Sequence, residues 1–85
     1  MNEELKRICN ILNINLNQRS FQRHITARRH VLVWFLKKKF SVEDVSQATG
    51  YRETSVYKIV THVEDLLSVK DKEIIFLIKK VEQNI

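Results

Sequence analysis

Apolar residues recur along most of this chain at spacings of three and four, which is the period of an amphipathic α-helix. The first such run, residues 3–12, has its apolar stripe at Leu5, Ile8, Cys9 and Leu12. The 85 residues contain one Gly and no Pro, fewer turn residues than a strand-rich domain of this size needs. The pattern therefore predicts an all-α fold, and the length predicts a single domain over residues 1–85.

Asparagines at positions 10, 13, 15 and 17 crowd the region after this run and predict a turn, because their side chains compete with the helical backbone. Ile14 and Leu16 alternate with them and are expected to tuck into the core. Residues 18–26 are polar and basic and predict a loop, followed by a helix from about residue 27 to 39. Residues 31–36 are apolar on every side of that helix, aromatic residues included, which indicates a central core helix.

Residues 41–67 have the pattern of a helix-turn-helix. Ser41 is a typical helix N-cap, and Asp44 stands three residues later as its reciprocal partner. Phe40 is placed to pack onto Val45 across this first turn. Gly50, the only glycine, supplies the left-handed conformation that ends the short helix. The longer helix that follows has one apolar face, made by Val56, Ile59, Val60, Val63, Leu66 and Leu67.

A last helix is predicted to begin near Ser68, because Asp71 follows three residues later and repeats the capping pattern. Its inward face is expected at Ile74, Ile75, Leu77, Ile78 and Val81. Phe76 falls off this stripe, so Phe76 and Ile85 are expected on the surface.

The net charge of +5 comes from one segment. Residues 1–18 balance two bases against two acids, and residues 40–85 hold eight acids and six bases. Residues 19–39 contain no acid and carry the basic side chains Arg19, Arg23, Arg28, Arg29, Lys37, Lys38 and Lys39. Such a local field favours a polyanionic partner, although the three lysines also suit a solvated helix C-terminus.

Catalytic and metal-binding patterns are missing from the sequence. One glycine cannot build a phosphate-binding loop, and no nucleophile lies near a base in the sequence. Cys9 is the only cysteine and is expected to be a small buried hydrophobe, and it forms no metal-ligand spacing with His24, His30 or His62. We therefore predict no enzyme, no cofactor and no metal, and we expect His24 and His30 to be surface or groove-facing residues of the basic segment.

The helix-turn-helix and the basic segment together predict binding of double-stranded DNA. In that arrangement the second helix enters the major groove, where Arg52 suits guanine and Thr54 and Ser55 suit phosphates or base edges. The expected major-groove residues are Arg52, Thr54, Ser55, Lys58 and His62. The expected contacts to flanking phosphates or the minor groove are Arg19, Arg23, Arg28 and Arg29.

From about Ile8 onward the chain resembles the C-terminal DNA-binding domain of the bacterial replication initiator DnaA, in the Trp-repressor-like helix-turn-helix group. The matching pieces stand in the family's order: ICNILNINLNQRS, ITARRHVLVWFLKK, FSVEDVSQATG, YRETSVYKIVTHVEDLL and a final amphipathic helix. The resemblance implies five or six helices and binding of double-stranded DNA. The initiator's nucleotide-binding module is not among these residues, so no ATPase activity is expected.

The match at the start of the second motif helix is partial. Thr54, Ser55 and Val56 match the family's two hydroxyl residues and valine, which follow an Arg-Asp-His triplet. Residues 51–53 are Tyr-Arg-Glu where the triplet would stand, and the turn is one residue shorter. Of the family's basic loop, Arg28 matches a second basic position, whereas the minor-groove arginine falls at about Thr26.

An alternative from another class is a helical protein-interaction module that keeps this scaffold without binding DNA. Glu53 at the start of the second motif helix favours it, as does the apolar last helix, which offers a surface for a homodimer or a protein partner. The N-terminus has no basic-then-apolar signal segment, and residues 31–36 are too short to span a bilayer. A soluble cytoplasmic protein is therefore expected.

Overall fold

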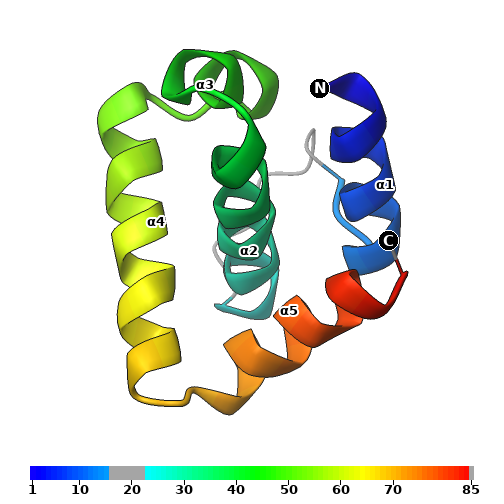
Figure 1. The fold of residues 1–85 in the computed structure, drawn as a ribbon, viewed down its shortest axis with the longest axis vertical. Helices are drawn as coiled ribbons and strands as arrows, with labels where there is room; N and C mark the ends of the chain where they lie inside the picture. The colour runs from blue at the N-terminus through cyan, green and yellow to red at the C-terminus, as the bar shows by residue number, and fades with distance from the viewer. Residues whose placement is uncertain (16–22, 85) are drawn as a thin grey trace.

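A computed structural model describes residues 1–15 and 23–84, with the backbone alone for residues 23 and 24. The helices are α1 (Asn2–Leu12), α2 (Arg23–Lys39), α3 (Val42–Thr49), α4 (Glu53–Ser68) and α5 (Lys72–Asn84). No strand occurs in the described ranges, which confirms the all-α prediction. In Figure 1, α2 lies between α4 on one side and α1 on the other, with α3 across one end and α5 across the other.

The first helix ends where the asparagines predicted a turn. Asn13 adopts the left-handed conformation at φ 56°, and its N–H donates to the carbonyl of Asn10. The N–H of Ile14 donates to the carbonyl of Cys9, which completes a Schellman motif. Ile14 is half-buried against the core, as expected, and Leu16 lies outside the described residues.

The second helix begins at Arg23, four residues earlier than the sequence predicted. The expected loop over residues 18–26 is therefore wrong for residues 23–26. Polarity alone does not interrupt a helix, and this stretch has neither Gly nor Pro to do so. Contacts with the rest of the fold also hold this first part of α2, because Ile25 is half-buried and Ala27 is buried.

The position of α2 at the centre of the fold confirms the interpretation of its apolar run. This helix contacts each of the other four helices, and Val31, Leu32, Val33 and Leu36 are almost fully buried. Trp34 and Phe35 pack against the core but stay half-exposed, with their rings edge to face at 5.0 Å. The ammonium of Lys38 lies 3.8 Å from the centre of the Trp34 ring and covers that open side.

The short helix α3 has the predicted ends. The hydroxyl oxygen of Ser41 accepts a hydrogen bond from the N–H of Asp44 at 3.2 Å. At the other end Gly50 is left-handed at φ 82°, and its N–H donates to the carbonyl of Ser46. Val45, between these two ends, is fully buried.

The cap of the last helix lies three residues after the predicted Ser68 cap. Ser68 belongs to α4, and Lys70 adopts the left-handed conformation at φ 57° just beyond it. The cap of α5 is Asp71, whose Oδ1 accepts from the N–H of Ile74 at 3.1 Å. The carbonyl of Leu66 accepts a hydrogen bond from the N–H of Asp71, and the carbonyl of Leu67 accepts one from the N–H of Lys70. These bonds close the last turn of α4, so Ser68 lies inside this helix and does not start a new one.

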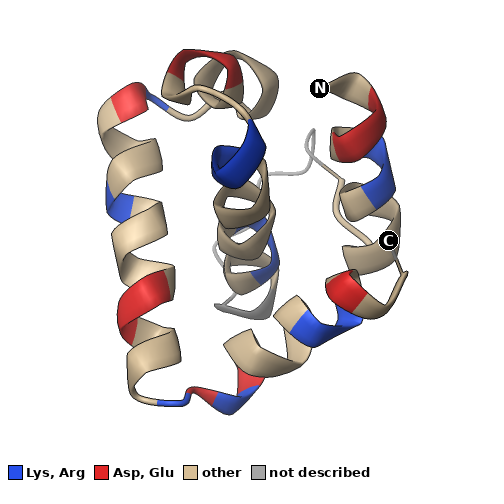
Figure 2. Cartoon of the chain, viewed as in Figure 1, with Lys and Arg blue, Asp and Glu red and all other residues tan. Residues whose placement is uncertain are grey.

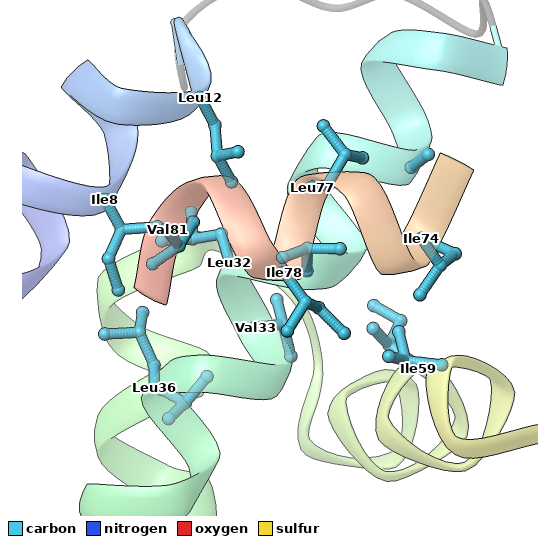
Figure 3. Packing of buried hydrophobic residues seen from close by; sticks show 14 of the residues in the cluster. Ile8, Leu12, Leu32, Val33, Leu36, Ile59, Ile74, Leu77, Ile78 and Val81 are labelled. Atoms are coloured by element: carbon cyan, nitrogen blue, oxygen red, sulfur yellow. The ribbon is translucent and has the colours of Figure 1, made fainter. Parts of the chain in front are cut away.

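Side chains from all five helices meet in one core. Figure 3 shows residues of α5 lying among those of α1, α2 and α4. The buried members of α5 are Ile74, Leu77, Ile78 and Val81. Ile75 is only half-buried, and Phe76 is 64% exposed, as its place off the stripe predicted. None of the helices described is long and apolar enough to cross a bilayer.

Candidate nucleic-acid interface

Helices α3 and α4 are joined by a turn of three residues, 50–52. Two hydroxyl groups hold this turn. The hydroxyl of Ser46 donates to the carbonyl of Tyr51, and that of Thr49 donates to the carbonyl of Val45 at 2.7 Å. The N–H of Tyr51 donates back to the hydroxyl of Thr49 at 3.5 Å. The turn is therefore held by side chains as well as by the Gly50 backbone. The usable sequence signal for these two hydrogen bonds is a pair of hydroxyl residues, Ser46 and Thr49, in the last turn before a helix-ending Gly.

The long helix α4 presents one exposed face along its whole length. Thr54, Lys58 and Thr61 recur at helical spacing, and Asp65 continues the stripe. All four side chains are exposed. Beside the stripe is a shallow hollow of about 320 Å³, lined by Tyr57, Lys58, Thr61, His62 and Asp65. The helix thus offers hydroxyl, ammonium and aromatic groups to a partner lying across it.

Of the predicted major-groove residues, four are exposed on or beside this face. They are Arg52, Thr54, Lys58 and His62. Ser55 is half-buried and shares the flank of His62, seven residues later. Arg52 occupies the N-cap position of α4, and its side chain makes no capping hydrogen bond there. The first amides of α4 consequently have no side-chain cap, which suits a phosphate oxygen.

Arg28 and Arg29 of α2 do not join that face. Arg28 lies about 160° around the helix from His30, given 3.6 residues per turn, and His30 is the residue that touches α4. Arg29 donates from Nη2 to the carbonyl of Asn15 at 3.3 Å, and its Nε is buried. Arg29 is thus directed toward the segment that follows α1. The predicted Arg19, and the side chain of Arg23 at the start of α2, lie outside the described part of the chain.

Charge is unevenly distributed over the motif. Residues 41–68 carry five acids (Glu43, Asp44, Glu53, Glu64 and Asp65) and two bases (Arg52 and Lys58), a net charge of −3. Figure 2 shows acidic bands on α3 and α4, whereas α2 carries basic bands toward both of its ends. Among the described residues, the excess positive charge therefore lies on α2 and not on α3 and α4.

A contact between two histidines joins α2 to α4. The rings of His30 and His62 lie edge to face with their centres 5.7 Å apart. Both line a pocket of about 330 Å³ together with Thr26, Ala27, Leu66, Asp71, Glu73 and Ile74. Burial lowers the pKa of His30 below 6.5, and the neighbouring His62 lowers this pKa further.

We expected His30 to be a surface or groove-facing residue of the basic segment; in the structure its ring contacts His62 of α4. His30 is half-buried against α4 because it shares a helix face with Ala27 and Trp34. That helical spacing could have predicted the burial of His30, but a polar residue such as histidine is not usually expected on a buried face.

Groups that could bind a metal or act as a nucleophile are sparse. The described residues contain no cluster of three His, Cys, Asp or Glu side chains placed to hold a metal ion. Cys9 is half-buried and packs against the core, and burial raises the pKa of its thiol. A raised pKa leaves less of the reactive thiolate at neutral pH.

Comparison of the chain with protein-family models, with curated proteins and with solved structures finds no match. Evidence on function therefore comes from the arrangement of the five described helices and from the residues on their surfaces.

Proposed function

We propose that this domain binds double-stranded DNA, with α4 in the major groove. The observation that carries the proposal is the three-helix unit. The short helix α3, a three-residue turn with left-handed Gly50 and the 16-residue helix α4 are braced from behind by α2. When its second helix lies in the major groove, a helix-turn-helix presents the N-terminal part of that helix to base edges. The resemblance to the DnaA C-terminal domain, through Thr54, Ser55 and Val56, supports the same class of ligand.

The contacts follow from the first turns of α4. Arg52 is exposed at the N-cap, where its guanidinium suits the O6 and N7 of guanine. Thr54 and the uncapped amides nearby suit a phosphate, and Lys58, one turn later, adds an ammonium. Glu53 lies between these groups and accepts a hydrogen bond from the amino group of a cytosine.

The charge of the motif sets the expected salt dependence. Arg52 and Lys58 are the basic side chains of residues 41–68, so this part of the chain brings two positive charges to the duplex and displaces about two condensed counterions. Affinity should then fall by about 1.8 log units for each log unit of salt, with a steeper slope where the lysines at the end of α2 also contact the duplex.

Fluorescence anisotropy with a random duplex pool at two salt concentrations tests the proposal. Lys58→Gln should weaken binding and reduce the salt slope by about 0.9. Lys79→Gln is the matched control, because Lys79 is an exposed lysine on α5 and its loss should leave binding unchanged. Absence of binding at low salt, or equal effects of the two substitutions, would contradict DNA binding through α4.

A second candidate function is protein interaction through the same scaffold. Two observations favour it, the net charge of −3 on residues 41–68 and the 64% exposure of Phe76 on α5. Sedimentation equilibrium tests the homodimer form of this alternative. A dimer that Phe76→Asp converts to a monomer, and that Lys58→Gln leaves intact, would favour protein interaction. A chain that stays monomeric at every concentration measured would contradict the homodimer hypothesis.

A further inference from the structure

The contact between His30 and His62 joins the two helices on which the helix-turn-helix depends. His30 projects from the middle of α2 and His62 from the third turn of α4, and their rings meet at 5.7 Å. One ring is half-buried and the other is exposed. An imidazole that gains a proton becomes a cation, so protonation of both rings places two like charges in contact.

Other charged groups surround this pair. Asp71 and Glu73, at the start of α5, line the same pocket as both rings. On α4 itself, Lys58 stands one turn before His62 and Asp65 stands three residues after it. Lys37 lies two turns after His30 on α2. His30 is the half-buried ring of the pair, whereas His62 is exposed.

We propose that the contact between His30 and His62 is a proton-sensitive joint, which weakens the packing of α2 on α4 when both imidazoles are protonated. The proposal is independent of DNA binding, because it concerns the packing of the two helices. Its consequence is that the helix-turn-helix is held most firmly at neutral pH and loosens under mild acid.

The direction of the pH effect follows from His30. In the unfolded chain the pKa of His30 is about 6.5. In the folded chain burial, and then the neighbouring His62, lower this pKa. Between the folded pKa and about 6.5 the unfolded chain binds more protons, so stability falls as the pH falls. The stability contributed by neutral His30 is present above about pH 6.5 and is lost as the pH falls through the folded pKa.

An NMR titration of the imidazole signals tests the joint directly in the full chain. His62→Gln removes the neighbouring charge from an exposed position, so the variant should fold. The titration midpoint of His30 should then rise toward 6.5. Thr61→Gln is the matched control on the same exposed face, and it should leave the midpoint of His30 where it is. A midpoint of His30 that does not move in His62→Gln would overturn the proposal.

Urea unfolding at about pH 7.5 and about pH 5, followed by the fluorescence of Trp34, measures the consequence. The unfolding constant of the unchanged chain should rise between these conditions, by about tenfold for each pH unit between the folded and unfolded pKa values of His30. The rise should be smaller in His62→Gln and unchanged in Thr61→Gln. An equal rise in all three chains would assign the acid effect to other groups and reject the joint.

Discussion

Gly50 shows how one residue determines the geometry of the motif. Its φ of 82° lies in the region that L-residues avoid, because their Cβ approaches the following carbonyl oxygen. A Cβ placed on Gly50 would meet no atom within 4 Å outside residues 49–51. Glycine is therefore favoured at this position by the backbone conformation and not by contacts with neighbouring side chains.

Gly50→Ala should consequently lower the free energy of unfolding by about 1–2 kcal/mol, the cost of a left-handed backbone at a non-glycine residue. Gly50→Asn should lose less, because asparagine tolerates this conformation. Urea denaturation of both variants measures the difference. Equal losses in the two variants would show that the side chain at position 50 meets a steric obstacle.

Two other residues adopt the same backbone conformation without being glycine. Asn13 was a foreseeable turn residue, since asparagine enters the left-handed region readily. Lys70 has no such tendency, and nothing in its side chain indicated a positive φ. Its conformation is part of the turn that joins α4 to α5, where the carbonyls of Leu66 and Leu67 both accept hydrogen bonds.

At the scale of whole elements, the start of α5 shows where a local capping signal was misleading. Ser68 and Asp71 both suit an N-cap, and either one could begin a helix when the sequence is taken alone. The apolar face of α4 includes half-buried Leu67, so this helix continues to Ser68. The cap of α5 then falls to Asp71.

Asp71→Ala should therefore destabilise the fold by about 1 kcal/mol, because the N–H of Ile74 loses its acceptor. Ser68→Ala should change stability by less than about 0.5 kcal/mol, because Ser68 is an exposed helical residue and alanine favours helix. Thermal unfolding monitored by circular dichroism compares the two. A larger loss for Ser68→Ala would restore the start of α5 that the sequence predicted.

At the scale of the molecule, the five described helices share one core inside an envelope of 29 × 26 × 25 Å. Because α2 touches every other helix, no pair of helices has a core of its own. Unfolding should consequently be a single cooperative transition, as is usual for small domains with one core.

Two probes test this cooperativity. The fluorescence of Trp34, the single tryptophan, reports on the centre of the fold, and far-ultraviolet circular dichroism reports on all helices. Their midpoints in urea should coincide. Leu36→Ala should move both midpoints together, with a loss of about 2–5 kcal/mol, because Leu36 is only 1% exposed. Separate transitions would indicate that α1 or α5 unfolds independently of α2, α3 and α4.

The distribution of charge also belongs to the whole molecule. The sequence placed the positive charge in residues 19–39, and the basic residues of α2 whose side chains the structure describes lie in two groups, residues 28–29 and 37–39. Arg28 faces away from α4, so a duplex lying on α4 does not meet the full basic segment at once. This separation is the physical reason why a modest salt slope is expected for DNA binding.

The sequence by itself determined the helical class, the cap at Ser41, the turn at Gly50 and the exposure of Phe76. These features depend on residues within one or two helical turns of each other, so the local sequence is enough to predict them. Only the tertiary structure decided that α2 begins at Arg23, that Asp71 and not Ser68 caps α5, and that His30 meets His62. Each of these depends on packing between elements distant in the chain, where burial and contact override the local preference of a residue.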